Sequence, residues 1–165
     1  MNKNDFPSWR QKLKASQRKE GNTVSNRWIQ IANVSRNQQP QVRTVVFRGW
    51  LDSNKMLIFT DKRSKKFYDL QINNNIEVLW LFFKSKSQYR FKGKAIMLDD
   101  DKKYWNNLSE KSKITWFWPS CGEKIDPQNK FFATEKTDLK PNNFAVIQLD
   151  IDEVDLLKLE KPIHK

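Results

Sequence analysis

A series of short apolar runs separated by polar turns is the feature of this sequence that most restricts its fold. β-Branched and aromatic residues dominate these runs, a composition typical of strands. The runs cover residues 27–35, 41–50, 56–60, 76–83, 88–98 and 143–149, and residues 154–159 are expected to extend the last one beyond a kink. Their connections are short, and strands do not alternate with helices as in a parallel sheet. The sequence therefore predicts a mainly β fold, a closed or partly open antiparallel barrel with helices at its edges.

Helices are expected at three places along the edges of this barrel. Residues 7–20 carry apolar side chains at helical spacing, with Ser8 as the expected N-cap. Residues 65–73 form a second short helix that ends at a run of asparagines. Residues 99–113 form a third, which begins with three aspartates where the helix dipole favours negative charge. Residues 114–141 are aromatic and are expected to be irregular.

The cysteine and histidine content excludes several classes of site. Cys121 is the only cysteine, so the chain can form neither an internal disulfide nor a cluster of thiolate metal ligands. His164 is the only histidine and lies one residue from the end, which argues against a Ser-His-Asp triad or a multi-histidine metal site. We therefore expect no metal and no side chain that acts as the catalytic acid or base.

Length, charge and hydropathy define the broad class. The 165 residues are expected to form one domain over residues 1–165, because that length is enough for one proper core. No apolar run approaches the length of a membrane span and the N-terminus lacks a signal-peptide hydrophobic region, so the protein is expected in the cytoplasm. The formal charge of +12 favours an anionic ligand without identifying it.

Basic residues and hydroxyls stand at the ends of two of the predicted strands. Arg43 opens the run that continues to Gly49, and the run that ends at Thr60 leads into a turn with the sequence Asp-Lys-Arg-Ser-Lys-Lys. Hydroxyl, guanidinium and ammonium groups together can hold a phosphate through charge-assisted hydrogen bonds. The two segments predict a pocket for a phosphorylated ligand on the rim of the barrel. The alternative is that these charged turns are simply solvated, as most such clusters are.

The order of these segments resembles the pyridoxamine 5′-phosphate oxidase superfamily of FMN-binding split barrels, and in particular a subgroup of oxidase-like proteins common in cyanobacteria. The similarity runs in the right order over nearly the whole chain. The matching segments are Trp9-Arg10, residues 43–49, residues 59–66, Gln88 with Gly93-Lys94-Ala95, residues 116–119, residues 143–145 and residues 154–157.

The resemblance implies an antiparallel FMN-binding split β-barrel that forms a homodimer, with the flavin site completed by both subunits. It implies that Arg43, Lys65 and Lys66 bind the FMN phosphate. Val45 and Val46 would line the isoalloxazine ring, and Gln88 would donate a hydrogen bond to the cofactor. The full set of residues implied to bind the cofactor is Arg43, Thr44, Val45, Val46, Phe59, Thr60, Ser64, Lys65, Lys66 and Gln88. Arg48 stands where the true oxidases carry a lysine, and it is implied to face the substrate.

The sequence departs from that family at two places. The segment Tyr104-Trp105-Asn106-Asn107-Leu108-Ser109 lacks the arginine with which true pyridoxamine phosphate oxidases hold the substrate phosphate. The sequence also ends at Lys165, where the family continues with an arginine and a final strand, so this C-terminal strand is expected to be missing. Both departures predict that pyridoxamine 5′-phosphate is a poor substrate.

Three functions are consistent with these residues. The first is an FMN-dependent oxidoreductase that acts on an unidentified small molecule, and the second is an FMN carrier or sensor without turnover. The third is a barrel that binds single-stranded nucleic acid through Tyr89 and Phe91 with Arg90, Lys92 and Lys94. The alternation of strand residues opposes the third function, because it places these aromatic and basic side chains on opposite faces.

Overall fold

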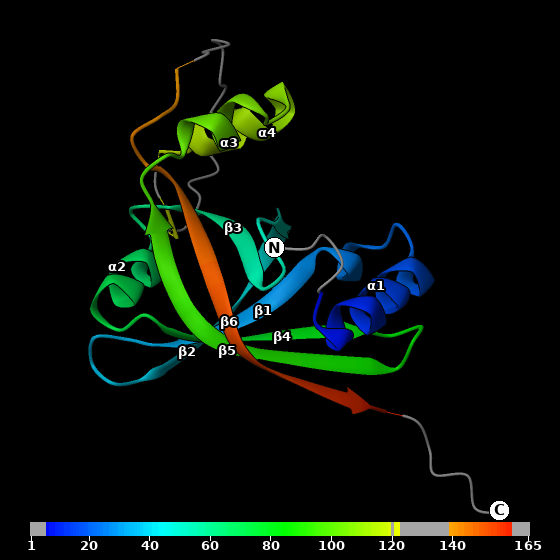
Figure 1. The fold of residues 1–165 in the computed structure, drawn as a ribbon. Coiled ribbons are helices and arrows are strands. Elements are labelled where there is room, and N and C mark those ends of the chain that lie inside the picture. The colour runs from blue at the N-terminus through cyan, green and yellow to red at the C-terminus, as the bar shows by residue number, and fades with distance from the viewer. Residues whose placement is uncertain (1–5, 120, 123–138, 160–165) are drawn as a thin grey trace, which may run out of the picture.

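Six described strands close into an antiparallel barrel in the order β1-β2-β3-β6-β5-β4 (Figure 1). The computed structural model describes residues 6–119, 121–122 and 139–159. The strands are β1 (Trp28–Val34), β2 (Pro40–Trp50), β3 (Lys55–Asp61), β4 (Asn75–Phe82), β5 (Ser87–Leu98) and β6 (Phe144–Lys158). The predicted strands are confirmed. The sequence predicted a closed or a partly open barrel, and the barrel is closed.

β6 is longer than the sequence indicated. Instead of a strand over residues 143–149 and a separate extension, one continuous strand runs from Phe144 to Lys158. Its first half pairs with β3 on one side, and β5 pairs with it on the other side from residue 146 to residue 158. A bulge between Lys92 and Gly93 absorbs the irregularity that the sequence suggested as a kink. The predicted loss of a further C-terminal strand concerns chain beyond residue 159, outside the described residues.

The first hydrophobic core fills the barrel. Strand residues alternate between the interior and the outer face, so that β4 reads exposed, buried, intermediate, buried along most of its length. The largest fully buried side chains of this core include Trp80, Phe82, Tyr89 and Phe91. Burial of each such side chain contributes about 1.5–3 kcal/mol to the stability of the barrel. Because Tyr89 and Phe91 lie inside this core, they cannot stack on bases, which agrees with the alternation argument against a nucleic-acid platform on β5.

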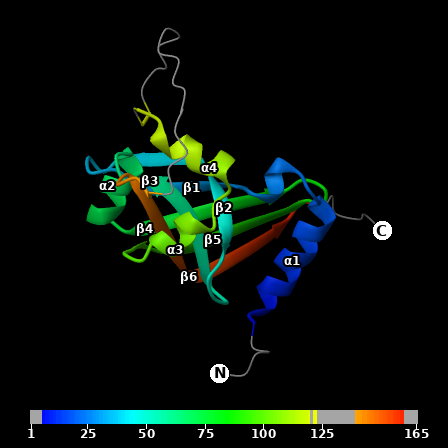
Figure 2. The same cartoon turned by 90° about the horizontal axis from the view of Figure 1, so that it is seen from above.

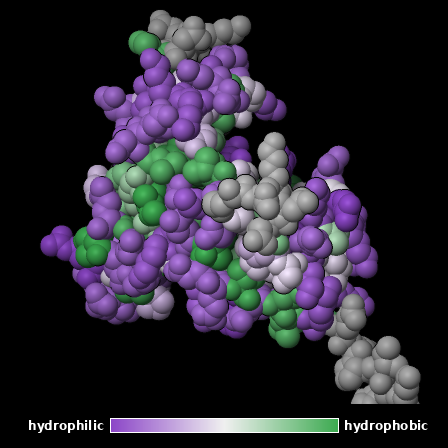
Figure 3. Space-filling view, in the orientation of Figure 1, coloured by the Kyte–Doolittle hydropathy of each residue, from purple (hydrophilic) through white to green (hydrophobic). Residues whose placement is uncertain are grey.

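A second core lies outside the barrel, beneath the short helices α3 (Lys102–Asn106) and α4 (Glu110–Ile114). It contains Leu57, Trp105, Phe144 and Val146, which are all buried, and aromatic rings of the turn at residues 115–117 pack against them. The outer surface of this layer is hydrophilic and the band below it is apolar (Figure 3).

The predicted single helix over residues 99–113 is wrong, because the chain breaks it between Asn106 and Glu110. The Ser109 hydroxyl accepts a hydrogen bond from the amide of Ser112 at 3.4 Å and begins a new helix there. Serine favours this N-cap position over a helix interior, since its hydroxyl competes for backbone groups.

Two longer helices lie at opposite sides of the barrel (Figures 1 and 2). Helix α1 (Ser8–Glu20) packs through Trp9, whose ring lies 5.7 Å from that of Trp50 and 5.6 Å from that of Phe91. Pro7, not Ser8, occupies the N-cap position, and no side chain caps this helix, so the predicted cap is wrong. Helix α2 (Lys65–Ile72) follows β3 directly, as predicted, and buries Phe67 and Leu70.

Candidate cofactor site

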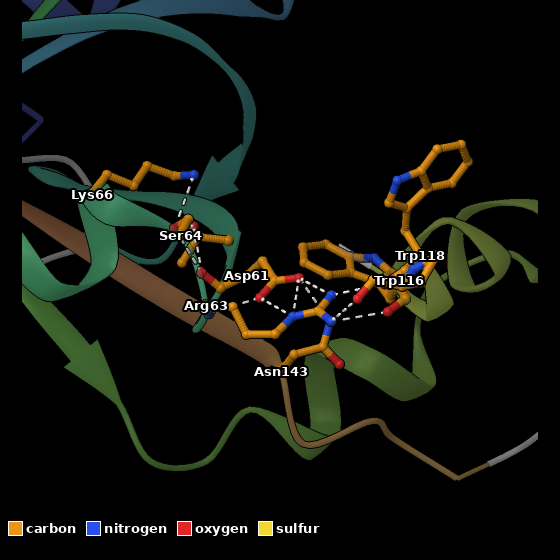
Figure 4. A network of polar contacts seen from close by, with 9 residues as sticks. Asp61, Arg63, Ser64, Lys66, Trp116, Trp118 and Asn143 are labelled. Atoms are coloured by element: carbon orange, nitrogen blue, oxygen red, sulfur yellow. Dashed lines mark hydrogen bonds and ion pairs between the residues drawn. The ribbon is translucent and has the colours of Figure 1, made fainter. Parts of the chain in front are cut away.

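Two buried hydroxyls and a lysine meet where β3 passes into α2. Thr60 and Ser64 are 2% and 8% exposed, and their hydroxyl oxygens lie 3.2 Å apart. The Lys66 ammonium donates to the Ser64 hydroxyl at 3.4 Å (Figure 4). Ser64 stands at the N-cap of α2, yet its hydroxyl makes no capping bond and donates instead to the carbonyl of Asp61 at 2.7 Å. These three side chains form a small patch of donors at the end of the barrel, which we call the hydroxyl–lysine cluster.

Arg43 adds a second cation to this region. Its guanidinium donates to the buried side-chain amide oxygen of Asn33, and burial lowers its pKa while the charge of Asp69 opposes that shift. Burial also lowers the pKa of Lys66, and the nearby charge of Arg43 lowers it further, although Cys121 and Asp61 act in the opposite direction. Neither cation forms an ion pair with a carboxylate among the residues that the structure describes. Two partly buried cations without carboxylate partners, one of which lowers the pKa of the other, favour an anionic ligand beside them.

Arg63 does not lie free in solvent, contrary to the expectation for a charged turn. Its guanidinium forms an ion pair with Asp61 at 2.8 Å and donates to the backbone carbonyls of Trp118 and Pro119, both at 2.9 Å. The Asn143 amide donates to the same carboxylate at 2.8 Å and to the carbonyl of Trp116 at 3.0 Å. Figure 4 shows this second group of contacts on the side of Asp61 opposite Lys66. We call Asp61, Arg63 and Asn143 the carboxylate clasp.

The clasp sets the charge state of Asp61. Burial alone would raise the pKa of this carboxyl, but hydrogen bonds from Arg63 and Asn143 outweigh it and hold the pKa below its usual range. Asp61 is therefore an anion at neutral pH. Its two partners hold that charge on the side that faces the 116–119 segment.

The residues of β2 divide between the two faces of the barrel. Val45 packs against the inner core, whereas Thr44 is exposed on the outer face. Val46 occupies that outer face too, opposite Trp28 of β1. Thr44 and Val46 are therefore placed to contact a ligand with their side chains, and Val45 contributes only backbone from that side.

Arg48 lies over the ring of Phe59, with 5.1 Å between the guanidinium carbon and the ring centroid. Burial and the charge of Arg27 both lower the pKa of Arg48, and neither arginine has a carboxylate partner among the described residues. The ring of Phe59 also contacts that of Tyr104, whose buried hydroxyl has no hydrogen-bond partner in the described part of the chain. Unpaired cations and a buried hydroxyl around one aromatic ring can receive an anionic group.

Lys65 lines a different space from the cluster. A cavity of about 720 Å³ lies between α2 and the turn that joins β1 to β2. Its lining residues include Lys65, Arg36, Tyr68 and Asp69, but not Thr60, Ser64 or Lys66. The structure thus places the two predicted phosphate-binding lysines on different surfaces of the first turn of α2.

Gln88 lies at the opposite end of β5 from the cluster. Thr60 pairs with Ala145 at the start of β6, whereas Gln88 pairs with Leu157 near its end. A strand rises about 3.3 Å per residue, so the twelve positions between these two partners separate them by far more than a side chain can reach. Within one chain, Gln88 cannot contact a ligand held by Thr60 and Lys66.

Sequence reasoning missed three of the residues that shape this region: Asn33, Asn143 and Tyr104. Asn33 stands on the inner, otherwise apolar side of β1, and a polar residue at a core position could have indicated it. Asn143 comes from a segment 82 residues away from its partner Asp61, and no local pattern predicts that contact.

The described ranges contain no candidate membrane span and no candidate metal site. Of the helices in the described ranges, none is long and apolar enough to cross a membrane. The same ranges hold no group of three or more histidine, cysteine or acidic side chains arranged to bind a metal ion.

The closed antiparallel barrel with few helices defines the class of this protein as a split barrel of the kind that binds flavin. The chain belongs to the family of pyridoxamine 5′-phosphate oxidase FMN-binding domains, whose model matches residues 6–99. The expected family is thereby confirmed, and so is FMN as its cofactor.

Relatives of known sequence or structure agree with this assignment. The chain is 26% identical over 166 aligned positions to pyridoxine/pyridoxamine 5′-phosphate oxidase 2 of Arabidopsis thaliana, covering 92% of this chain and 83% of the relative. A pyridoxamine 5′-phosphate oxidase-related, FMN binding protein from Nostoc punctiforme superposes with a TM-score of 0.85 at 27% identity, over 96% of this chain and 88% of that one. PhzG from Burkholderia lata shares the fold, with a TM-score of 0.70 at 14% identity over 90% of this chain and 75% of that one.

The residues present fit the phosphate of FMN. Two hydroxyls and an ammonium converge at the end of β3, and a second cation lies near enough to lower the pKa of Lys66. A phosphate monoester offers these groups up to about two negative charges at neutral pH.

Proposed function

We propose that this protein is an FMN-dependent oxidoreductase that acts as a homodimer on an anionic small molecule. The observation that carries the proposal is the pair of partly buried cations, Arg43 and Lys66, beside two buried hydroxyls and without an ion-pair partner in the described chain. When bound, FMN supplies the transfer of hydride or electrons.

The roles of this chain are binding, orientation and electrostatics. Arg43, Thr60, Ser64 and Lys66 would hold the cofactor phosphate, and Lys65, which lines a different cavity, is left out of this set. Thr44, Val46 and Phe59, together with the backbone at Val45, would form the wall for the ring system. This division of labour needs no acid or base among the side chains.

The substrate is proposed to be an anion, because Arg48 lies beside Phe59, the charge of Arg27 acts on Arg48, and neither arginine has a carboxylate partner in the described chain. The hydroxyl of Tyr104, next to Phe59, also has no hydrogen-bond partner there. The cations there would bind and orient the negative group of the substrate through charge-assisted hydrogen bonds. An arginine pair fixes a planar anion more tightly than a single lysine would.

A second copy of the chain is proposed to supply Gln88 to each flavin. Gln88 lies too far from the cluster of its own chain, and its neighbours on the outer face are apolar: Leu81 of β4 and Leu157 of β6. Trp28 and Val42 extend this outer face and are 50% and 70% exposed. Large apolar side chains at such exposure favour a protein–protein contact.

Phosphate recognition is tested by comparing FMN with riboflavin. The purified chain, freed of flavin, should bind FMN more tightly than riboflavin in a fluorescence titration, because only FMN carries the phosphate. Arg43→Ala and Lys66→Ala should each cost about 1.5–3 kcal/mol of FMN affinity, the usual contribution of a hydrogen bond to a charged group. Lys62→Ala removes a charge from the same turn and serves as the matched control, with unchanged affinity. Equal affinity for both flavins in the parent would place the phosphate elsewhere.

Turnover separates an enzyme from a carrier or sensor. The flavoprotein should oxidise NAD(P)H or another reductant in steady state, whereas a carrier would hold its flavin without turnover.

Pyridoxamine 5′-phosphate should be a poor substrate, because residues 104–109 supply no arginine for its phosphate. A kcat/KM for it near or above the common range of about 10⁴ M⁻¹s⁻¹ would contradict this and would assign its phosphate to Arg48.

A further inference from the structure

A carboxylate stands in the wall of the proposed phosphate pocket, where it should oppose binding. Asp61 lies between Thr60 and the turn that leads to Ser64, and its charge is close enough to raise the pKa of Lys66. A dianionic phosphate held by Thr60, Ser64 and Lys66 would therefore experience repulsion from this side chain. Something in the structure must offset that charge if the pocket is to bind phosphate.

The carboxylate clasp supplies that offset. The guanidinium of Arg63 reaches both carboxylate oxygens of Asp61, with Nη2 2.8 Å from one and Nε 3.1 Å from the other. The amide of Arg63 donates to the same carboxylate at 2.8 Å, and the side chain of Asn143, the residue before β6, does so at 2.8 Å. These four donors hold the carboxylate on the side away from Lys66 (Figure 4), and the guanidinium of Arg63 compensates its charge.

The same guanidinium fixes a distant part of the chain. Its remaining donors reach the carbonyls of Trp118 and Pro119, which lie more than fifty positions further along the chain. The side chain of Asn143 adds a third bond to this segment, at the carbonyl of Trp116. The 116–119 segment packs on the second core, so the clasp joins the turn beside the cofactor to the layer formed by α3 and α4.

We propose that Arg63 is a positioning residue for the cofactor: it neutralises Asp61 and turns it away, so that the hydroxyl–lysine cluster can accept the phosphate of FMN. The inference rests on the proposed function, because it takes that cluster to be the phosphate site. Four of the five N–H donors of Arg63 already bind Asp61, Trp118 and Pro119, so Arg63 acts on the phosphate through Asp61.

The decisive experiment is a double-mutant cycle with two ligands. Arg63→Ala leaves Asp61 as an uncompensated charge, and FMN affinity should fall about tenfold, the effect expected for one charge acting on a dianion across several ångströms of partly hydrated protein. Riboflavin affinity should stay within about threefold, because riboflavin has no charge for Asp61 to repel. Asp61→Asn combined with Arg63→Ala removes that charge and should restore most of the FMN affinity.

Controls separate this inference from the proposed function. Lys62→Ala, in the same turn, should leave the affinities for FMN and for riboflavin unchanged. Lys66→Ala should weaken the binding of FMN but not that of riboflavin. If Lys66→Ala and Arg43→Ala have no effect, the proposed phosphate site itself is wrong. If they weaken FMN binding but Arg63→Ala does not, only the role of Arg63 is overturned.

Two further outcomes also overturn the role of Arg63. One is an equal loss of FMN and riboflavin affinity in Arg63→Ala, which would indicate general structural damage. The other is a double variant as weak as Arg63→Ala. Should Arg63→Ala fail to fold, Arg63→Lys retains the charge with fewer donors. It should keep FMN affinity within about threefold of the parent, and a tenfold loss would overturn the charge argument.

Discussion

Lys66 is the residue whose protonation controls the proposed phosphate site most directly. Its ammonium is the donor to Ser64, and its burial and the charge of Arg43 hold its pKa below the ordinary value of 10.5. In the protein without ligand, the charge of Lys66 is therefore lost at a lower pH than that of an exposed lysine. A bound phosphate would act in the opposite direction, because it stabilises the ammonium form.

This shift predicts how FMN affinity depends on pH. The phosphate of FMN is fully ionised above about pH 7, so a loss of affinity at alkaline pH below the ordinary lysine pKa of 10.5 reports on the protein. The parent should lose affinity as pH rises through the lowered pKa of Lys66. Lys66→Arg should keep its affinity over this range, because a guanidinium stays charged. A parent whose dissociation constant is flat to pH 10 would remove Lys66 from the phosphate.

At the scale of single elements, the contact between β5 and β6 depends on one glycine. A Cβ atom on Gly93 would lie 1.8 Å from the backbone carbonyl oxygen of Asp150, and backbone cannot move aside as a flexible side chain can. Gly93 stands at the bulge where the register of the two strands shifts. The absence of a side chain therefore allows the two longest strands of the barrel to approach each other.

Gly93→Ala should destabilise the protein by at least about 1–3 kcal/mol, the usual cost of forcing extra volume into a packed contact. Unfolding in guanidinium chloride, followed by tryptophan fluorescence, measures the change. Lys94→Ala, at the next and exposed position of β5, is the control and should change stability by less than about 0.5 kcal/mol. Equal unfolding midpoints for the parent and Gly93→Ala would show that β6 can shift without cost.

Local patterns determined which elements could be predicted. Strand alternation and turn residues were enough for the barrel strands, and the helical spacing of Phe67, Leu70 and Ile72 before a run of asparagines indicated α2. The interruption at Asn107–Ser109 was missed because acidic residues at the start of the segment favoured one helix, whereas the capping bond of Ser109 and the packing of Trp105 favour two.

The site was predictable from local sequence where its residues are near one another, and Arg43 was added to it by the family resemblance. Thr60, Ser64 and Lys66 fall within one turn, and the structure brings them together. Arg63 belongs to the same turn, but its role depends on carbonyls from residues 118 and 119 and was not predictable. Gln88 is the opposite case. The sequence matched it to a cofactor ligand of the family, but its position on β5 places it too far from the hydroxyl–lysine cluster of its own chain to share a ligand with it.

The whole molecule is proposed to be half of a symmetric dimer. The outer face of β1 and β2 carries Trp28 opposite Val46, and the next strand pairs bring Leu81, Gln88 and Leu157 into the same region. An apolar surface around a single amide is consistent with an interface in which that amide serves the partner's ligand. A dimer with two equivalent sites is the commonest assembly for such a surface.

Trp28→Glu should disrupt this dimer, because it places a charge at the centre of an apolar contact. Sedimentation at micromolar concentration should show a dimer for the parent and a monomer for the variant, with weaker FMN binding in the monomer. Ile114→Glu, on α4 and 42% exposed, is the control and should remain dimeric. A parent that sediments as a monomer with FMN bound would refute the shared site.

The presence of two separate hydrophobic cores has a consequence for local motion. The inner core is enclosed by the strands, whereas, among the residues that the structure describes, α3, α4 and the turn after them cover the second core. Because the two cores do not share their buried residues, the outer layer can open while the barrel stays closed. Amide hydrogens of α3 and α4 should then exchange with solvent through a low-energy opening, and those of β4 and β5 only when the whole barrel unfolds.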